Sequence, residues 1–109
     1  MEDIKLEINQ KDNWGVISLV GRLDRVNADE VYASGEKEMS SREKLAVELT
    51  GLEYISSAGI RVLLRLAKKA KSEDKSFALC GAAGFVKEVL EDSNLDMLVT
   101  MLDSASQLS

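Results

Sequence analysis

Residues 44–71 read KLAVELTGLEYISSAGIRVLLRLAKKAK, which combines a strand, a short loop and a helix in direct succession. The run Leu45–Val47 is continuously apolar, as expected for an inner strand covered on both faces, and it predicts a strand from Lys44 to Thr50. A helix is predicted from about Ala58 to Lys71. Its apolar residues recur at helical spacing on one face: Ile60, Leu63, Leu64, Ala67 and Ala70. A strand that leads directly into an amphipathic helix is the repeating unit of an α/β fold.

The residues before this stretch predict a hairpin and a first helix. Apolar and polar residues alternate over Ile4–Ile8, and a second strand is predicted over Trp14–Val20 after a polar turn. The first helix is predicted from about Asn27 to Met39. Asn27 is a plausible N-cap, with Glu30 three residues on as its capping-box partner.

The residues after the stretch continue the alternation of strands and helices. They predict a strand over Ser76–Cys80, a helix over Ala83–Glu91, a weak strand over Met97–Met101 and a last helical turn within Asp103–Leu108. The order β-β-α-β-α-β-α-β implies right-handed crossovers and a mixed, largely parallel sheet with an antiparallel contribution at the start. With 109 residues and no repeat or linker, the chain is expected to form one domain over residues 1–109.

Composition excludes several classes of protein. The formal net charge of −5 argues against a nucleic-acid-binding protein, which needs a concentrated basic face. No apolar run reaches the roughly 18 residues of a membrane span, and the charged, alternating N-terminus argues against a signal peptide. The single cysteine, Cys80, lies in an apolar run where a reduced thiol is usual. We therefore expect a cytoplasmic protein, with a monomer as the default state.

Basic residues recur on the polar side of the second predicted helix. They are Arg61, Arg65, Lys68, Lys69 and Lys71. The simplest interpretation is a solvated helix surface, because such faces are common. A docking stripe for an acidic partner is the alternative.

Two adjacent serines, Ser56 and Ser57, stand where this helix begins. A serine oxygen that accepts the N–H of Gly59 or Ile60 would cap the helix, but one serine suffices for a cap. Gly59 is expected to leave the nearby backbone unshielded, and a helix N-terminus favours an anion. A phosphate on the second hydroxyl would add about −1.5 to −2 charges. The cap and a modification site are therefore compatible interpretations.

Catalytic, cofactor and metal sites find little support in the sequence. A nucleophilic serine needs an adjacent base, yet the chain has no histidine and its nearest lysines begin at Lys68, more than two helical turns away. The segment Gly81–Gly84 lacks the Lys and Ser/Thr of a phosphate-binding loop and predicts a tight strand-to-helix turn. No carboxylates or cysteines have metal-ligand spacing, so neither a metal nor a cofactor is expected.

A second turn is predicted beside the serines. The segment Gly21–Asp24 is expected to leave the sheet after the second strand, where Arg22 and Asp24 suit turn chemistry. If the strands are ordered as expected, this turn shares a sheet edge with the serine loop. Asp24 would then be an acidic neighbour of a phosphorylated serine.

The chain resembles a STAS domain over essentially its whole length. The resemblance rests on Gly21–Asp24 with Asn27-Ala28, on Tyr54–Ile60 after the third strand, and on Gly81. It implies a stand-alone anti-sigma factor antagonist without enzymatic activity. Such a domain binds an anti-sigma factor that is itself a serine kinase of the GHKL type, and thereby releases a sigma factor. Phosphorylation of a loop serine abolishes binding, and a PP2C-type phosphatase resets the domain.

The resemblance assigns roles residue by residue. Ser57 matches the phosphoacceptor, two residues before Gly59, and Ser56 is the fallback. Ser56 stands where many members carry aspartate, and Ala58 where many carry serine or threonine. Asp24 matches a turn aspartate at the partner interface. The expected partner-binding set is Asp24, Ser56, Ser57, Ala58, Gly59 and Arg61.

Three other functions stay open at this point. The chain could be a STAS-type scaffold or accessory subunit of a stress-signalling or lipid-transport complex, with Ser57 as a helix cap and no phospho-switch. It could bind a nucleotide or small molecule at the helix N-terminus. An enzyme is the remaining class, against which the missing histidine and scattered carboxylates argue.

Overall fold

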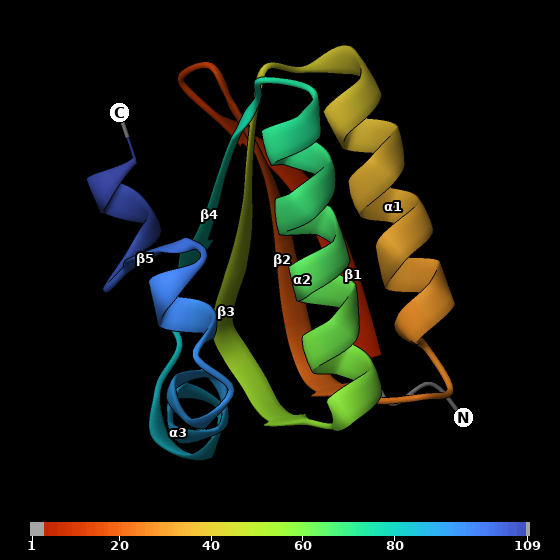
Figure 1. Cartoon of the computed structure of the whole chain (residues 1–109), viewed down its shortest axis with the longest axis vertical. Coiled ribbons are helices and arrows are strands. Elements are labelled where there is room, and N and C mark those ends of the chain that lie inside the picture. Colours follow the sequence, from red (N-terminus) through yellow and green to blue (C-terminus); the bar gives the residue numbers. More distant parts are fainter. Residues whose placement is uncertain (1–3, 109) are drawn as a thin grey trace.

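The computed structural model describes residues 4–108 and arranges them as one mixed sheet with helices over one face (Figure 1). The elements are β1 (Ile4–Lys11), β2 (Trp14–Leu23), α1 (Ala28–Ser41), β3 (Lys44–Ile55), α2 (Ser57–Ser72), β4 (Ser76–Cys80), α3 (Gly84–Asp92), η1 (Leu95–Met97), β5 (Thr100–Leu102) and η2 (Ala105–Gln107), where η is a 3₁₀ helix. This order confirms the predicted α/β class.

The strands lie in the order β1-β2-β3-β4-β5. β1 and β2 form the predicted antiparallel hairpin, and every later neighbour is parallel. Because parallel strands end at the same edge of a sheet, the β2–α1, β3–α2 and β4–α3 connections meet there. The prediction that the turn after β2 neighbours the serine loop is therefore confirmed.

The main core lies between the sheet and the helices. Leu19 and Leu23 of β2 and Leu63 and Leu66 of α2 are fully buried in it. α1 and α2 pack closely, since a Cβ on Gly35 would lie 2.8 Å from both Cδ atoms of Leu66. A second, smaller cluster on the opposite face contains Trp14, Val16, Ala46, Ala78, Cys80 and Leu108.

The buried face of α2 differs in part from the predicted one. Leu63 and Ala70 are buried as expected, but Ile60, Leu64 and Ala67 are only partly buried. Val62 and Leu66 are buried in their place. Apolar residues stand on both flanks of this helix, so periodicity alone did not fix which flank faces the sheet.

Three strand boundaries also differ from the prediction. The segment Gly21–Asp24 was expected to leave the sheet, but β2 continues to Leu23, paired with the extension of β3 to Ile55. Register shifts between β2 and β3 interrupt the alternation that would have revealed this pairing. The strand expected over Met97–Met101 is β5, only Thr100–Leu102, because Leu95–Met97 forms a 3₁₀ turn after the left-handed Asn94.

The smaller cluster encloses Cys80, whose thiol is fully buried. Burial, and to a lesser extent the nearby charge of Glu48, raises the pKa of Cys80 to about 11. The thiol is therefore protonated at neutral pH and a poor nucleophile.

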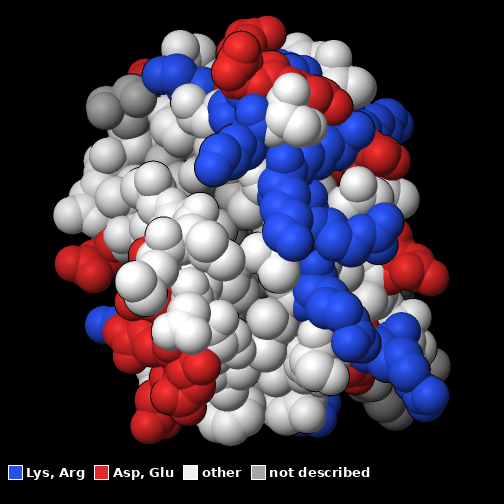
Figure 2. All heavy atoms as spheres, in the orientation of Figure 1, with Lys and Arg blue, Asp and Glu red and all other residues white. Residues whose placement is uncertain are grey.

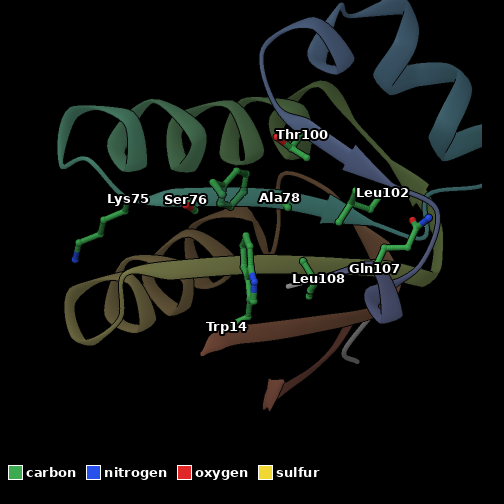
Figure 3. Close-up of a pocket in the computed structure, with 9 residues that line it drawn as sticks. Trp14, Lys75, Ser76, Ala78, Thr100, Leu102, Gln107 and Leu108 are labelled. Atoms are coloured by element: carbon green, nitrogen blue, oxygen red, sulfur yellow. The ribbon is translucent and has the colours of Figure 1, made fainter. Parts of the chain in front are cut away.

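A cavity of about 490 Å³ lies beside this cluster, between β4 and the C-terminal segment. Figure 3 shows nine residues that line it, among them Trp14, Ser76 and Leu108. Lys11 holds the segment by donating from Nζ to the carbonyl oxygen of Leu108 (3.1 Å). Trp14 and Ser76 begin their strands, so this cavity lies toward the other end of the sheet from the serine loop.

Within residues 4–108, no helix is both long and apolar enough to span a bilayer.

Candidate functional site

The two serines of the β3–α2 loop have different roles. Ser56 has an extended backbone and is the N-cap of α2, its hydroxyl oxygen accepting the N–H of Gly59 at 3.5 Å. Its own N–H donates to the carbonyl oxygen of Leu23 (3.0 Å), which fixes the loop to the end of β2. The cap predicted from the sequence is thus confirmed and assigned to Ser56.

Ser57 is the first residue of α2, and its side chain is exposed. Its hydroxyl makes no hydrogen bond with any residue that the structure describes. The cap role that the scaffold alternative gave to Ser57 is therefore wrong, because Ser56 already fills that position. What Ser57 presents is a free hydroxyl at the start of a helix.

The β2–α1 turn is held by side chains that bond to its backbone. Asp24 accepts the N–H of Val26 through Oδ1 (3.0 Å) and donates its own N–H to Oδ1 of Asn27 (3.0 Å). Nδ2 of Asn27 donates to the carbonyl oxygen of Arg22 (2.8 Å). Asp24 therefore has the turn chemistry that was expected, and its position is fixed from both sides.

The capping box predicted for Asn27 and Glu30 is wrong. Asn27 does occupy the predicted N-cap position of α1, with its carbonyl oxygen accepting the N–H of Val31, but its side chain makes no cap hydrogen bond. The buried side-chain amide of Asn27 instead forms hydrogen bonds with backbone groups of the preceding turn. Leaving this buried amide without partners would cost free energy of folding. Local sequence patterns do not separate these two uses of an asparagine.

The two loops together border a shallow depression of about 310 Å³. It is lined by Asp24, Arg25, Val26, Ser56, Ser57, Ala58 and Arg61. Five of the six residues expected at a partner interface are thus brought together. The exception is Gly59, which was expected to leave the backbone unshielded but is buried.

Gly59 serves the packing of the loop instead. A Cβ at this position would lie 2.8 Å from Cγ of Leu23, 2.8 Å from Cγ1 of Ile55 and 3.0 Å from the carbonyl oxygen of Leu23. Glycine therefore allows the first turn of α2 to rest directly on the ends of β2 and β3.

We expect Gly59→Ala to lower the free energy of unfolding by about 1–2 kcal/mol. Alanine gains up to about 1 kcal/mol of helix propensity, but overpacking against buried neighbours costs about 1–3 kcal/mol. Urea unfolding followed by circular dichroism measures the difference. Ser57→Ala, two residues away and exposed, is the control and should change stability by less than about 0.5 kcal/mol. A Gly59→Ala protein as stable as the parent would contradict this account of the glycine.

One exposed apolar residue lines the depression, and an aromatic pair stands on the elements next to its loops. Val26, 83% exposed, lines it directly. The ring of Tyr54 stacks on that of Phe85 with centroids 5.7 Å apart, and the Arg22 guanidinium lies 4.2 Å from the centroid of Tyr54. The sequence pattern did not single out Val26, Tyr54 or Phe85 as surface groups, because an exposed apolar residue has no periodic signature. Exposed apolar and aromatic residues such as Val26 and Phe85 are typical anchors of protein interfaces.

The Ser57 hydroxyl lacks the neighbours that catalytic serines and metal sites commonly have. The sequence contains no histidine to activate the Ser57 hydroxyl. Over residues 4–108, no three Cys, Asp or Glu side chains come together as a metal site would require. An unbonded hydroxyl between Asp24, Arg25 and Arg61 can receive a group from an external enzyme, and can contact a partner.

Both a family model and a protein of known sequence match most of the chain. Residues 6–102 match the family model described as "Mlab, STAS domain". A Bordetella bronchiseptica protein assigned as the anti-sigma factor antagonist BtrV is 33% identical over 91 residues, which cover 83% of this chain and 78% of that protein.

Solved structures share the fold. The crystal structure of a Thermotoga maritima protein assigned as an anti-sigma factor antagonist matches with a TM-score of 0.81 and 25% identity, covering 94% of this chain and 89% of that one. Bacillus SpoIIAA in its phosphorylated form matches with a TM-score of 0.70 and 15% identity, covering 89% and 90% respectively.

Proposed function

The chain belongs to the STAS domain family, and from this premise we propose that it is an anti-sigma factor antagonist switched by phosphorylation of Ser57. The observation that carries the proposal is the exposed Ser57 hydroxyl. It forms no hydrogen bond with residues 4–108, and it lies beside the turn that contains Asp24. Because Ser56 supplies the cap, Ser57 is available for modification without loss of the helix terminus.

In the unmodified state, the depression and its rim bind an anti-sigma factor, and the sigma factor held by that protein is released. The anti-sigma factor is a serine kinase of the GHKL type that phosphorylates Ser57. A PP2C-type phosphatase removes the phosphate. A phosphorylated protein with this fold is known, because the structure of Bacillus SpoIIAA has been solved in its phosphorylated form.

Charge explains how the phosphate would block binding. A phosphate adds about −1.5 to −2 charges to a depression lined by Asp24, Arg25 and Arg61, and so changes the sign of its net charge from positive to negative. Those charges would have to be desolvated against the partner, at a cost of several kcal/mol. The α2 N-terminus favours an anion, so the fold itself tolerates the modification.

The remaining parts of the proposal concern the context of the switch. We place the chain in the cytoplasm as one monomeric domain, where Cys80 stays reduced. It acts by binding, without cofactor or metal, and the kinase and phosphatase perform the chemistry.

Incubation of the protein with ATP and kinases from its native lysate, followed by intact-mass measurement and peptide mapping, tests the modification. We expect one added phosphate on Ser57, which is lost in Ser57→Ala and kept in Ser56→Ala. Phosphate on Ser56 would move the switch by one residue. No phosphate, with the kinases shown to be active, would favour the scaffold or accessory-subunit alternative.

A further inference from the structure

The outer face of α2 carries a charge opposite to that of the whole chain. The helix contains five basic residues and no acidic one, although the chain has 19 acidic residues and a net charge of −5. Figure 2 shows these side chains as a continuous stripe along the helix, with an uncharged area beside it. A basic stripe on a net acidic protein is electrostatically suited to an acidic partner.

Part of the stripe is already engaged within the protein. Lys69 pairs with Glu36 of α1 (3.6 Å) and with Glu73 (2.9 Å). The Arg65 guanidinium lies 4.0 Å from the centroid of the Tyr32 ring. By contrast, Lys68 and Lys71 are exposed and form no ion pair or hydrogen bond with residues 4–108. Their spacing of three residues places both ammonium groups on one side of the helix.

A groove of about 320 Å³ with a mixed polar and apolar lining runs along the side of α2 that carries Lys71. It lies between α2 and the segment that leads into β5, and its lining includes Ala67, Ala70, Lys71, Phe77, Leu98 and Val99. Leu98 is 64% exposed and Met97 beside it is 79% exposed, so two adjacent large apolar side chains lie open to solvent. The groove therefore combines open apolar surface with unpaired positive charge.

We propose that this surface, formed by the groove with Lys68 and Lys71, binds an acidic amphipathic helix of the same partner that contacts Ser57. The inference rests on the proposed function. Leucine-like side chains of such a helix would enter the groove, while its carboxylates would face the two lysines. Lys71 lies 14 residues after Ser57, about 21 Å along the helix axis, so this is a second contact rather than part of the serine site.

The charges around the groove favour a protein segment over an anionic membrane. Exposed carboxylates stand on η1 and on α3, which lies below β5 in Figure 1: Glu88, Glu91, Asp92 and Asp96. Figure 2 shows acidic side chains gathered below the uncharged area. A negatively charged bilayer would meet these groups as well as the lysines and would be repelled by them. A single acidic helix can contact the lysines alone.

Two affinity measurements test the proposal on the full chain. The first uses an 18-residue helical peptide with Leu at i, i+3, i+4 and i+7, three Glu beside this face and Ala elsewhere, titrated while amide resonances are followed by NMR. We expect shifts at Ala67, Lys71 and Leu98, and none with the same peptide carrying Lys in place of Glu. Equal shifts with both peptides, or binding to phosphatidylglycerol vesicles without peptide binding, would overturn the proposal.

The second measurement uses the kinase that modifies Ser57. The double variant Lys68→Glu/Lys71→Glu should bind it roughly tenfold more weakly at low salt, with a smaller difference at high salt. Lys5→Glu/Lys87→Glu has the same change of charge at exposed positions on β1 and α3 and is the control. Leu98→Ser should weaken binding at every salt concentration.

The two proposals fail in different ways. Full affinity of Ser57→Asp for the kinase would remove the proposed switch. Weak binding of Ser57→Asp, together with unchanged binding of both Lys68→Glu/Lys71→Glu and Leu98→Ser, would remove only the second contact.

Discussion

Ser57→Asp is expected to bind the anti-sigma kinase at least about a hundredfold more weakly than the unmodified protein, whereas Ser57→Ala should bind with unchanged affinity. An added carboxylate at the depression must be desolvated against the partner beside Asp24, and a loss of about 2.7 kcal/mol corresponds to a hundredfold. Aspartate carries one charge and phosphate nearly two, so the phosphorylated protein should bind more weakly still. Isothermal titration at physiological ionic strength measures the three affinities.

The stability of Ser57→Asp separates a loss of contact from a loss of fold. An acidic residue in the first turn of a helix is favourable by about 0.3–1 kcal/mol, so the variant should unfold at the same urea concentration as the parent or higher. Ser40→Asp adds the same charge near the end of α1, at the opposite end of the molecule (Figure 1), and should bind normally. Equal weakening by both variants would mean that overall charge, rather than the Ser57 site, decides binding.

Leu66→Ala is expected to lower the free energy of unfolding by about 3 kcal/mol, within the 2–5 kcal/mol range for such truncations. The Leu66 side chain is fully buried where α2 meets α1. Opposite it stands Gly35, which has no side chain to fill the space. The midpoint of thermal unfolding should fall by more than about 10 °C, as measured by calorimetry.

Leu98→Ala is the matched control for this prediction. It removes the same atoms from a side chain that is 64% exposed, so its effect should stay below about 0.5 kcal/mol. Comparable losses in the two variants would show that the contact between α1 and α2 is not a main source of stability.

Much of the fold follows from local patterns. The apolar run Leu45–Val47 and the amphipathic helix after it were enough to predict a parallel strand–helix unit, and the remaining units had the same form. The paired extensions of β2 to Leu23 and β3 to Ile55 depend on a register that neither strand specifies alone. The buried flank of α2 likewise depends on its neighbours, because Leu63 and Leu64 are equally apolar and only packing distinguishes them.

In the candidate site, too, some features follow from local sequence and others depend on tertiary contacts. The pair Ser56-Ser57 before a helix was visible as a motif, and strand order was enough to bring Asp24 near it. The buried amide of Asn27 and the packing role of Gly59 are tertiary properties, so their short-range sequence context suggested other roles. A local motif thus indicated which hydroxyl to test, and the tertiary contacts explain why its neighbours stay in place.

The hydrogen bond from Ser56 to Leu23 and the bonds of Asn27 to its turn have a consequence for the timing of the switch. Both loops are already ordered before any partner arrives, so neither association nor modification waits for a segment to fold. In the proposed switch, the interval between a stimulus and a change in free sigma factor should therefore be set by the turnover of the kinase and of the phosphatase. Slowing either enzyme should lengthen the response in proportion, with no residual lag from the antagonist itself.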